Sequence, residues 1–263
     1  MTGRAMRFEK WEGLGNDFVL VDDPAVAIGP DQARILCDRR FGVGGDGVLI
    51  VDRRGSLPRM IVWNADGSRP EMCGNGLRCV AAHLVAADRE ATLSIATDAG
   101  EKACAVIAVA ADRFDVTVEM GAAHARGEIA FTVDSHEHRF LDVDVGNPHA
   151  ITFAPYDEAA IDRVGAAVAV APKGGTNVEF CRVEADRIVV VVWERGVGRT
   201  LACGTGACAV AAAACDTGRA SFGAPICVAL PGGELIITVT ATTRALRMRG
   251  PARRVFTGEA LLA

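Results

Sequence analysis

Two cysteines stand in matching glycine-rich turns and could work as an acid and a base on one carbon. Residues 72–82 read MCGNGLRCVAA and residues 202–212 read ACGTGACAVAA, so Cys73 and Cys203 each precede an Ala-rich apolar segment. A thiol at the start of a helix lies near unpaired N–H groups and a partial positive charge, which lower its pKa and favour the thiolate. If a thiolate on one face of a carbon removes a proton while a thiol on the other face donates one, the stereocentre inverts. The pattern therefore predicts inversion of a carbon centre by two cysteines.

The residues that follow each cysteine suit the binding of a carboxylate. Gly74 and Gly204 let a ligand approach the backbone closely, and the N–H groups of a helix start bind anions. Asn75 and Thr205 can cap the helix or contact the ligand. A carboxylate held between two such turns would place its α-carbon between two sulfur atoms, where oriented dipoles stabilise the charge that develops.

Other interpretations of the cysteines remain open at this point. Two structural helix starts could carry cysteines incidentally, and a Cys-His hydrolase could use His149 as its base, although it would leave the second turn unexplained. Zinc is disfavoured, because the cysteines of each turn are six or five residues apart and structural zinc ligands usually lie two to four apart. Small buried hydrophobes are expected at the cysteines in apolar runs, namely Cys37, Cys104, Cys181, Cys215 and Cys227.

The composition indicates a globular protein. Of the 263 residues, 50% are hydrophobic and 23% are charged, which is enough for one large domain or two ordinary ones. The formal net charge is −5 and there is no Lys/Arg run, which disfavours nucleic acid as a partner. Apolar stretches are too short to span a bilayer and no signal-peptide core opens the chain. We therefore expect a soluble, cytoplasmic protein with reduced thiols and no membrane contact.

The spacing of the two turns predicts two duplicated domains. They lie 130 residues apart, about half the chain, which puts the boundary near residue 120. Amphipathic helices are predicted at Asp31–Arg40 and Glu158–Val168. Short β-rich segments are predicted at Met6–Trp11, Phe18–Asp22, Val48–Asp52, Met60–Asn64, Phe114–Glu119, Val178–Val183, Ile188–Trp193 and Leu235–Thr240.

Two familiar cofactor patterns do not fit. Gly42, Gly44 and Gly47 match GxGxxG, but a helix-like segment precedes this loop and a strand follows it, the reverse of a dinucleotide site. The chain has three lysines, and none lies in a site motif, which argues against a pyridoxal phosphate Schiff base. We expect no cofactor and no metal.

Further motifs run along the whole chain, namely Gly13 to Phe18, Gly42 to Gly47, Asn64 to Ser68, Glu71 to Gly76, Gly146 to Ala150, Thr176 to Phe180, Trp193 to Gly196, Ala202 to Gly206, Gly250 to Ala252 and Val255 to Glu259. In these segments the sequence resembles the diaminopimelate epimerase family over essentially its full length. It departs from the family at Gly47, where many members have Gln.

This resemblance implies a fold and a reaction. The fold would be α/β (α+β), with two pseudo-symmetric domains, each a strongly curved, mainly antiparallel sheet or barrel around a central helix. The domains would be residues 1–120, with 251–263 packing back on them, and residues 121–250, and the active site would lie in the cleft between them. The enzyme would interconvert LL- and meso-diaminopimelate for lysine and peptidoglycan synthesis, without pyridoxal phosphate. A homodimer stays open.

The resemblance also implies a role for each matched residue. Cys73 and Cys203 would be the bases, and His149 and Glu194 would tune their pKa values. Arg195 offers a fork for the distal carboxylate of diaminopimelate and Glu194 suits an ammonium. The implied substrate-binding residues are Asn16, Asn64, Gly74, Asn75, Asn147, Asn177, Glu194, Arg195, Gly204 and Thr205.

Two rival functions remain. A racemase of another amino acid, of the proline, hydroxyproline or histidine type, could share the fold, but proline racemases typically carry His at the position of Asn75. Such a substrate would also give no reason for the residues assigned to a distal end. A binding protein that has lost catalysis is the second rival, and the presence of both cysteines argues against it.

Overall fold

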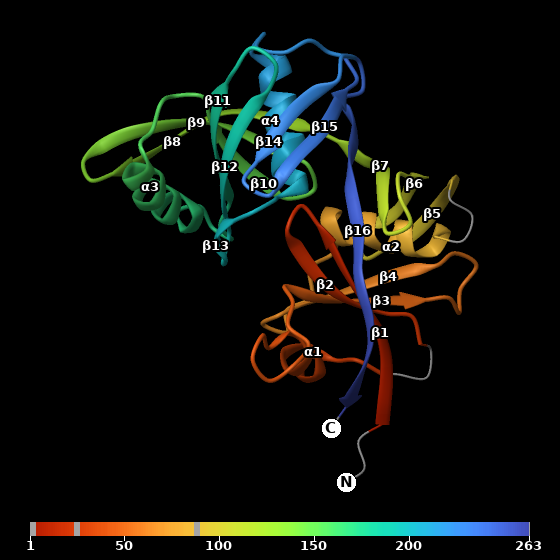
Figure 1. The fold of residues 1–263 in the computed structure, drawn as a ribbon. Coiled ribbons are helices and arrows are strands. Elements are labelled where there is room, and N and C mark those ends of the chain that lie inside the picture. Colours follow the sequence, from red (N-terminus) through yellow and green to blue (C-terminus); the bar gives the residue numbers. More distant parts are fainter. Residues whose placement is uncertain (1–3, 24–26, 87–89, 263) are drawn as a thin grey trace. The chain divides into compact units, whose positions relative to one another are not determined.

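The computed structural model describes residues 4–23, 27–86 and 90–262, and it divides the chain into two compact units. Unit 1 comprises Met1–Val118 and Gly250–Ala263, and unit 2 comprises Glu119–Arg249. Figure 1 shows the elements of both units. Among the described residues, no helix combines the length and the apolar character that a membrane span requires.

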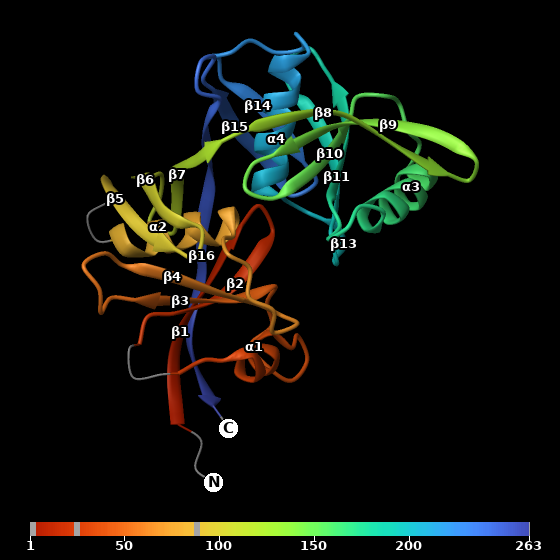
Figure 2. The same cartoon turned by 180° about the vertical axis from the view of Figure 1, so that it is seen from behind.

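Unit 1 is a closed path of strands around a helix. Its sheet runs β1-β2-β3-β4-β5-β6-β7-β16, and β16 also pairs with β1, which closes the path. Helix α1 (Pro30–Cys37) packs on β3 and β4, whereas α2 (Gly74–Val85) contacts β1 to β6. Figure 2 shows α2 from behind, between β4 and the strands β5 and β6. The strands are β1 (Arg4–Gly13), β2 (Asn16–Val21), β3 (Gly47–Asp52), β4 (Arg59–Asn64), β5 (Glu90–Thr97), β6 (Gly100–Ala108), β7 (Arg113–Ala122) and β16 (Ala245–Leu262).

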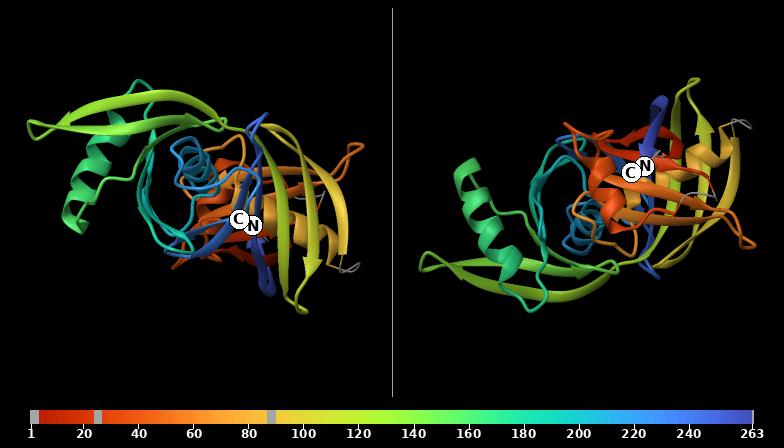
Figure 3. Two further views of the ribbon diagram at one scale, coloured as in Figure 1. Left: turned by 90° about the horizontal axis from the view of Figure 1, so that it is seen from above. Right: turned by 90° about the horizontal axis from the view of Figure 1, so that it is seen from below.

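Unit 2 repeats this order of elements around its own helix. Its sheet runs β16-β15-β14-β12-β11-β10-β9-β8, with β13 paired to β12. Helix α4 (Gly204–Asp216) contacts five of these strands, and α3 (Glu158–Val170) covers the outer face of β11 and β12, as Figure 3 shows. The strands are β8 (His124–Val133), β9 (His136–Asp144), β10 (Pro148–Thr152), β11 (Asn177–Val183), β12 (Ile188–Glu194), β13 (Gly198–Thr200), β14 (Ile226–Leu230) and β15 (Gly233–Val239).

The two units share one topology, which confirms the predicted pair of similar domains, each a curved sheet around a central helix. In unit 1, β2 and β3 run parallel across α1, and β4 and β5 run parallel across α2. In unit 2, β10 and β11 run parallel across α3, and β12 and β14 run parallel across α4. Each central helix is apolar nearly all round, so burial on every side is its stable state.

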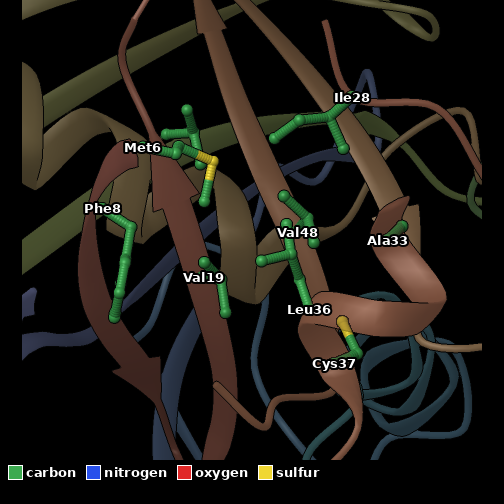
Figure 4. Close-up of a cluster of buried hydrophobic side chains, with 9 residues drawn as sticks. Met6, Phe8, Val19, Ile28, Ala33, Leu36, Cys37 and Val48 are labelled. Atoms are coloured by element: carbon green, nitrogen blue, oxygen red, sulfur yellow. The ribbon is translucent and has the colours of Figure 1, made fainter. Parts of the chain in front are cut away.

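The outer helix of unit 1 is held by an apolar cluster. Leu36 and Cys37 of α1 point towards Val19 and Val48 of the sheet, as Figure 4 shows. The predicted helix Asp31–Arg40 was three residues too long, because the carboxylate of Asp38 accepts the N–H groups of Arg40 and Phe41 and ends α1 at Cys37.

Each strand predicted from the sequence is present, with ends that differ by up to three residues. Strands β5, β6, β8, β9, β10, β13, β14 and β16 were missed. The last of these, β16, supplies residues 246–249 to the sheet of unit 2 and residues 253–262 to that of unit 1.

A charged cluster fixes the loop between α1 and β3. Lys10 Nζ lies 2.6 Å from Asp17 Oδ2, and Arg39 Nη2 lies 2.6 Å from Asp17 Oδ1 and 2.8 Å from Asp46 Oδ1. Burial opposes ionisation of the Asp17 carboxyl, but hydrogen bonds from Arg39 and Lys10 outweigh it and lower its pKa to about 2. The ionised carboxylate therefore stabilises the folded protein above the ordinary pKa of 3.8.

We expect Asp17→Asn to destabilise the protein at pH 7 by about 2 kcal/mol, the value of a shift of nearly two pKa units. Because the folded-state pKa is depressed, this contribution is complete above about pH 4 and falls by about half at pH 3. Urea unfolding at both pH values measures it. The control Glu259→Gln removes an exposed ion pair with Arg7 and should change stability little. A pH-independent penalty for Asp17→Asn would contradict the assignment.

Candidate active site

Each of the two cysteines is the N-cap residue of a central helix, as the sequence predicted. Cys73 precedes α2 with φ −131° and ψ 112°, and its Sγ accepts the N–H of Gly76 at 3.4 Å. Cys203 precedes α4 with φ −123° and ψ 108°, and its Sγ accepts the N–H of Gly206 at 3.3 Å. A cysteine thus takes the place of the usual Ser, Thr, Asp or Asn, which puts sulfur among the N–H groups of the first turn.

The third residue after each cysteine is a glycine that lies close to a side chain of the sheet. A Cβ at residue 76 would lie 2.7 Å from Leu49 Cδ2, and a Cβ at residue 206 would lie 2.7 Å from Glu179 Oε1. Both first turns therefore press closely against the sheet of their own unit. This close packing fixes the position of each sulfur relative to the strands.

In unit 1 two of the predicted site residues lie at strand ends. Asn16 begins β2 and Asn64 ends β4, where its Nδ2 donates to Ser68 Oγ at 2.9 Å. The Oδ1 atom of Asn16 is buried and accepts no hydrogen bond from the described part of the protein. A buried acceptor of this kind suits an ammonium donor from a ligand.

Arg78 holds Asn75 in place, and sequence reasoning missed it. Its side chain is fully buried, and its Nη2 donates to Asn75 Oδ1 at 3.0 Å. Its Nε donates to the carbonyl of Pro251 at 3.0 Å, and its Nη1 to that of Gly74 at 3.4 Å. An arginine within an apolar helix was the available signal, because a buried guanidinium needs several acceptors.

In unit 2 a chain of hydrogen bonds leads from His149 to Cys203. His149 Nε2 lies 3.1 Å from Asn147 Oδ1, and Asn147 Nδ2 lies 3.4 Å from Thr205 Oγ1. Thr205 Oγ1 in turn lies 3.5 Å from Cys203 Sγ. Four of the predicted site residues are therefore connected.

Glu179 was missed as a site residue and lies at the far end of this chain. Its Oε1 lies 2.7 Å from Nδ1 of His149, and neither side chain is exposed to solvent. The second oxygen, Oε2, is buried and accepts no hydrogen bond from the described residues. The sequence signal was a glutamate between two apolar residues, Val178 and Phe180, in a predicted strand.

Asn177, Glu194 and Arg195 lie where β11 begins and β12 ends. Asn177 Oδ1 accepts the backbone N–H of Arg195 at 3.0 Å, so this asparagine ties the two strand ends together. Arg195 Nη1 donates to the carbonyl of Gly174 at 2.6 Å. Glu194 Oε1 accepts the hydroxyl of Thr200 at 2.5 Å. Burial raises the pKa of the Glu194 carboxyl, and the charge of Glu179 raises it further.

The expectation of a lowered thiol pKa is wrong for Cys203. Burial raises the pKa of this thiol well above its ordinary value, and the carboxylates of Glu194 and Glu179 raise it further. The bonds from Thr205 and from the N–H of Gly206 act in the opposite direction but are weaker. The cost of burying a thiolate thus outweighs the helix start here.

Five other cysteines were expected to be small buried hydrophobes. Cys37, Cys104, Cys181 and Cys215 are buried as predicted, whereas Cys227 is only partly buried. Burial raises the pKa of Cys37 to about 11 and that of Cys104 to about 12. Among the described residues, no three His, Cys, Asp or Glu side chains gather as metal ligands would.

The glycine-rich loop before β3 is not a dinucleotide site. It follows α1 and leads into β3, the order predicted from the sequence. A Cβ at Gly42 would lie 2.1 Å from the carbonyl of Ile35, and one at Gly47 would lie 2.7 Å from that of Trp63. Close backbone packing therefore leaves no room for a side chain at either glycine without a shift of the chain.

Comparison with known proteins connects this geometry to a family. Residues 8–125 and 142–255 match the family described as diaminopimelate epimerase. The chain is 41% identical to the diaminopimelate epimerase of Synechocystis sp., over 97% of this chain and 99% of that protein. It is also 41% identical to the diaminopimelate epimerase of Desulforudis audaxviator, with the same coverage.

Solved structures of low sequence identity share the fold. A hydroxyproline epimerase from Agrobacterium vitis aligns with a TM-score of 0.76 at 15% identity, covering 100% of this chain and 93% of that one. A phenazine biosynthesis protein of the PhzF family from Bacillus anthracis aligns with a TM-score of 0.73 at 14% identity, covering 98% and 100%.

The cysteine-capped helices, the matching units and the relatives' 41% identity over nearly the whole length lead to one assignment: this chain belongs to the diaminopimelate epimerase family, whose members are isomerases.

Proposed function

We propose that this chain interconverts LL- and meso-2,6-diaminopimelate, with Cys73 and Cys203 as the two acid/base groups and without pyridoxal phosphate. The observation that carries the proposal is the equivalent placement of the two sulfurs, each as the N-cap of a buried helix in its own unit. The names of the relatives supply the substrate. The reaction would serve lysine and peptidoglycan precursor synthesis in the cytoplasm.

The proton balance of the reaction is simple. One sulfur, as thiolate, takes the α-proton from one face of the substrate, while the other, as thiol, donates a proton to the opposite face. The electron pair left on the α-carbon is shared with the carboxylate, whose charge is stabilised by the N–H groups at the starts of α2 and α4. After one turnover the two sulfurs have exchanged roles. The proposal requires both helix starts to meet the same substrate carbon.

The remaining residues suit the second end of a symmetric diamino diacid. Arg195 offers a guanidinium for the distal carboxylate, and Glu194 offers an acceptor for an ammonium group. Asn16, Asn64, Asn147 and Asn177 can each donate to one group and accept from another. A small amino acid such as proline or hydroxyproline has no distal end for them. We therefore favour diaminopimelate over the racemase alternative, although a hydroxyproline epimerase shares the fold.

We expect Cys73→Ser and Cys203→Ser each to lower kcat by at least about a hundredfold, because a hydroxyl is a far weaker base and acid than a thiol near neutral pH. Exchange of the α-proton of LL-diaminopimelate in heavy water, followed by NMR, measures the loss. Matched controls are Cys79→Ala and Cys208→Ala, which change a buried cysteine later in the same two helices. Near-normal exchange in either serine variant would rule out the two-cysteine mechanism.

We expect Arg195→Ala to raise KM for diaminopimelate by about tenfold or more, with a smaller effect on kcat, because it removes a charge-assisted bond to the distal carboxylate. L-Lysine, which lacks that carboxylate, should exchange its α-proton equally slowly with both enzymes. Arg199→Ala is the control, since Arg199 pairs with Glu158 and Asp162 at the surface. A variant that discriminates the two substrates as the wild type does would remove Arg195 from this role.

A further inference from the structure

A buried contact between the carboxylate of Glu179 and the imidazole of His149 lies near Cys203 and has no part in the mechanism above. Neither Glu179 nor His149 is exposed to solvent, and their 2.7 Å contact lies between β11 and β10. Oε2 of Glu179 has no hydrogen-bond donor among the described residues. Burying a carboxylate with an oxygen left unpaired is costly, so the pair does not serve stability well.

The fold does not require this pair, because unit 1 carries apolar residues at the two corresponding positions of its own sheet. In the parallel strands β10 and β11, His149 pairs with Asn177, and Glu179 follows two residues later. In the parallel strands β2 and β3, Phe18 pairs with Gly47, and Leu49 follows two residues later.

The glycines of the two helix starts confirm this correspondence. A Cβ built at Gly76 would lie against Leu49, and a Cβ built at Gly206 would lie against Glu179. Phe18 and Leu49 are buried at the positions that correspond to His149 and Glu179. At these corresponding positions unit 2 therefore carries a histidine and a glutamate, whereas unit 1 carries two apolar side chains.

Glu179 is connected to Cys203 on two sides. On one side, Glu179 is hydrogen-bonded to His149, and the hydrogen bonds continue through Asn147 and Thr205 to the sulfur. Across the helix start the two side chains are near neighbours, since a Cβ built at Gly206 would lie 2.7 Å from Glu179 Oε1 and 3.2 Å from Cys203 Sγ.

We propose that Glu179 is a positioning residue for the epimerisation: its carboxylate accepts Nδ1–H of His149, holds the chain through Asn147 and Thr205, and favours the protonated form of Cys203. The proposal deepens the proposed function and rests on it. Cys203 then starts as the acid of the pair of cysteines. The surroundings of Cys203 and Cys73 therefore differ chemically although the two units share a topology. The raised pKa of the Cys203 thiol agrees with this.

Among the described residues of unit 2, the titratable groups near Cys203 come from three strands. Glu194 comes from β12, Glu179 from β11 and His149 from β10. Glu194 also raises the pKa of the thiol, so removal of Glu179 should reduce the effect without abolishing it.

The kinetic test compares Glu179→Gln and Glu179→Leu with the wild type, and uses Glu184→Gln as a control. Leucine is the residue that unit 1 carries at this place, and Glu184 is an exposed residue just beyond the same strand, paired with Arg182. We expect Glu179→Leu to lower kcat at least about tenfold with little change in KM. Glu179→Gln should retain more activity, because its amide oxygen can still accept Nδ1–H.

The pH profile separates this role from a merely structural one. Both variants remove a negative charge near the thiol, so its pKa falls and the alkaline limb of kcat/KM moves to lower pH. Glu184→Gln should leave rates and profile unchanged. Wild-type kcat and an unshifted profile in Glu179→Leu would overturn the proposal.

A measurement on the unmodified protein keeps the proposal testable if the variants do not fold. Nitrogen-15 NMR of the histidines should show Nδ1 of His149 carrying a proton between pH 6 and 8, with the signal assigned by its loss in His149→Phe. An unprotonated Nδ1 in the wild type would overturn the proposal. Absence of α-proton exchange with LL-diaminopimelate in the wild type would instead refute the proposed function, and the NMR result would still decide the His149–Glu179 geometry.

Discussion

The structure depends on the burial of one apolar helix inside each curved sheet. Helix α4 consists almost wholly of Gly, Ala, Cys and Val, and its residues from Ala207 to Cys215 are buried. Small side chains let strands approach it from several sides, and a helix that is apolar all round has no other stable place. Once the helix is enclosed, the packing of its first turn against the strands fixes the position of the residue that caps it.

This constraint explains why the polar residues gather at one edge of each sheet. In unit 2 the parallel strands β10 and β11 begin at the same edge where β12 ends, and α4 starts there as well. His149, Asn177 and Glu194 occupy these ends. Unit 1 places Phe18, Gly47 and Asn64 in the corresponding positions. The duplicated topology thus gives the two units similar backbone arrangements, and different side chains at corresponding positions make the two units chemically distinct.

The sequence predicted the parts of this arrangement that are encoded locally. The two cysteine turns, the apolar segments after them and strands such as Ile188–Trp193 follow from patterns of a few residues. Strand β8 was missed because most of its residues are exposed and it is ordered by pairing with β9, which no local pattern records. Glu179 and Arg78 were missed for a related reason, since burial of a charge depends on partners supplied by distant strands. The predicted direction of the pKa shift of the Cys203 thiol was wrong. The start of a helix can be predicted from neighbouring residues, whereas the two carboxylates near the thiol come from other strands.

The long strand β16 has a consequence for synthesis of the protein. Its second half, residues 253–262, pairs with β1 at the opposite end of the chain. Until the ribosome has released those last residues, the sheet of unit 1 lacks a strand and β1 has an open edge, although unit 1 is made first. Unit 2, by contrast, contains nearly all of its strands in one continuous stretch. The unit that carries Cys73 is therefore completed after unit 2, and a nascent chain halted before residue 253 would hold one finished sheet and one unfinished one.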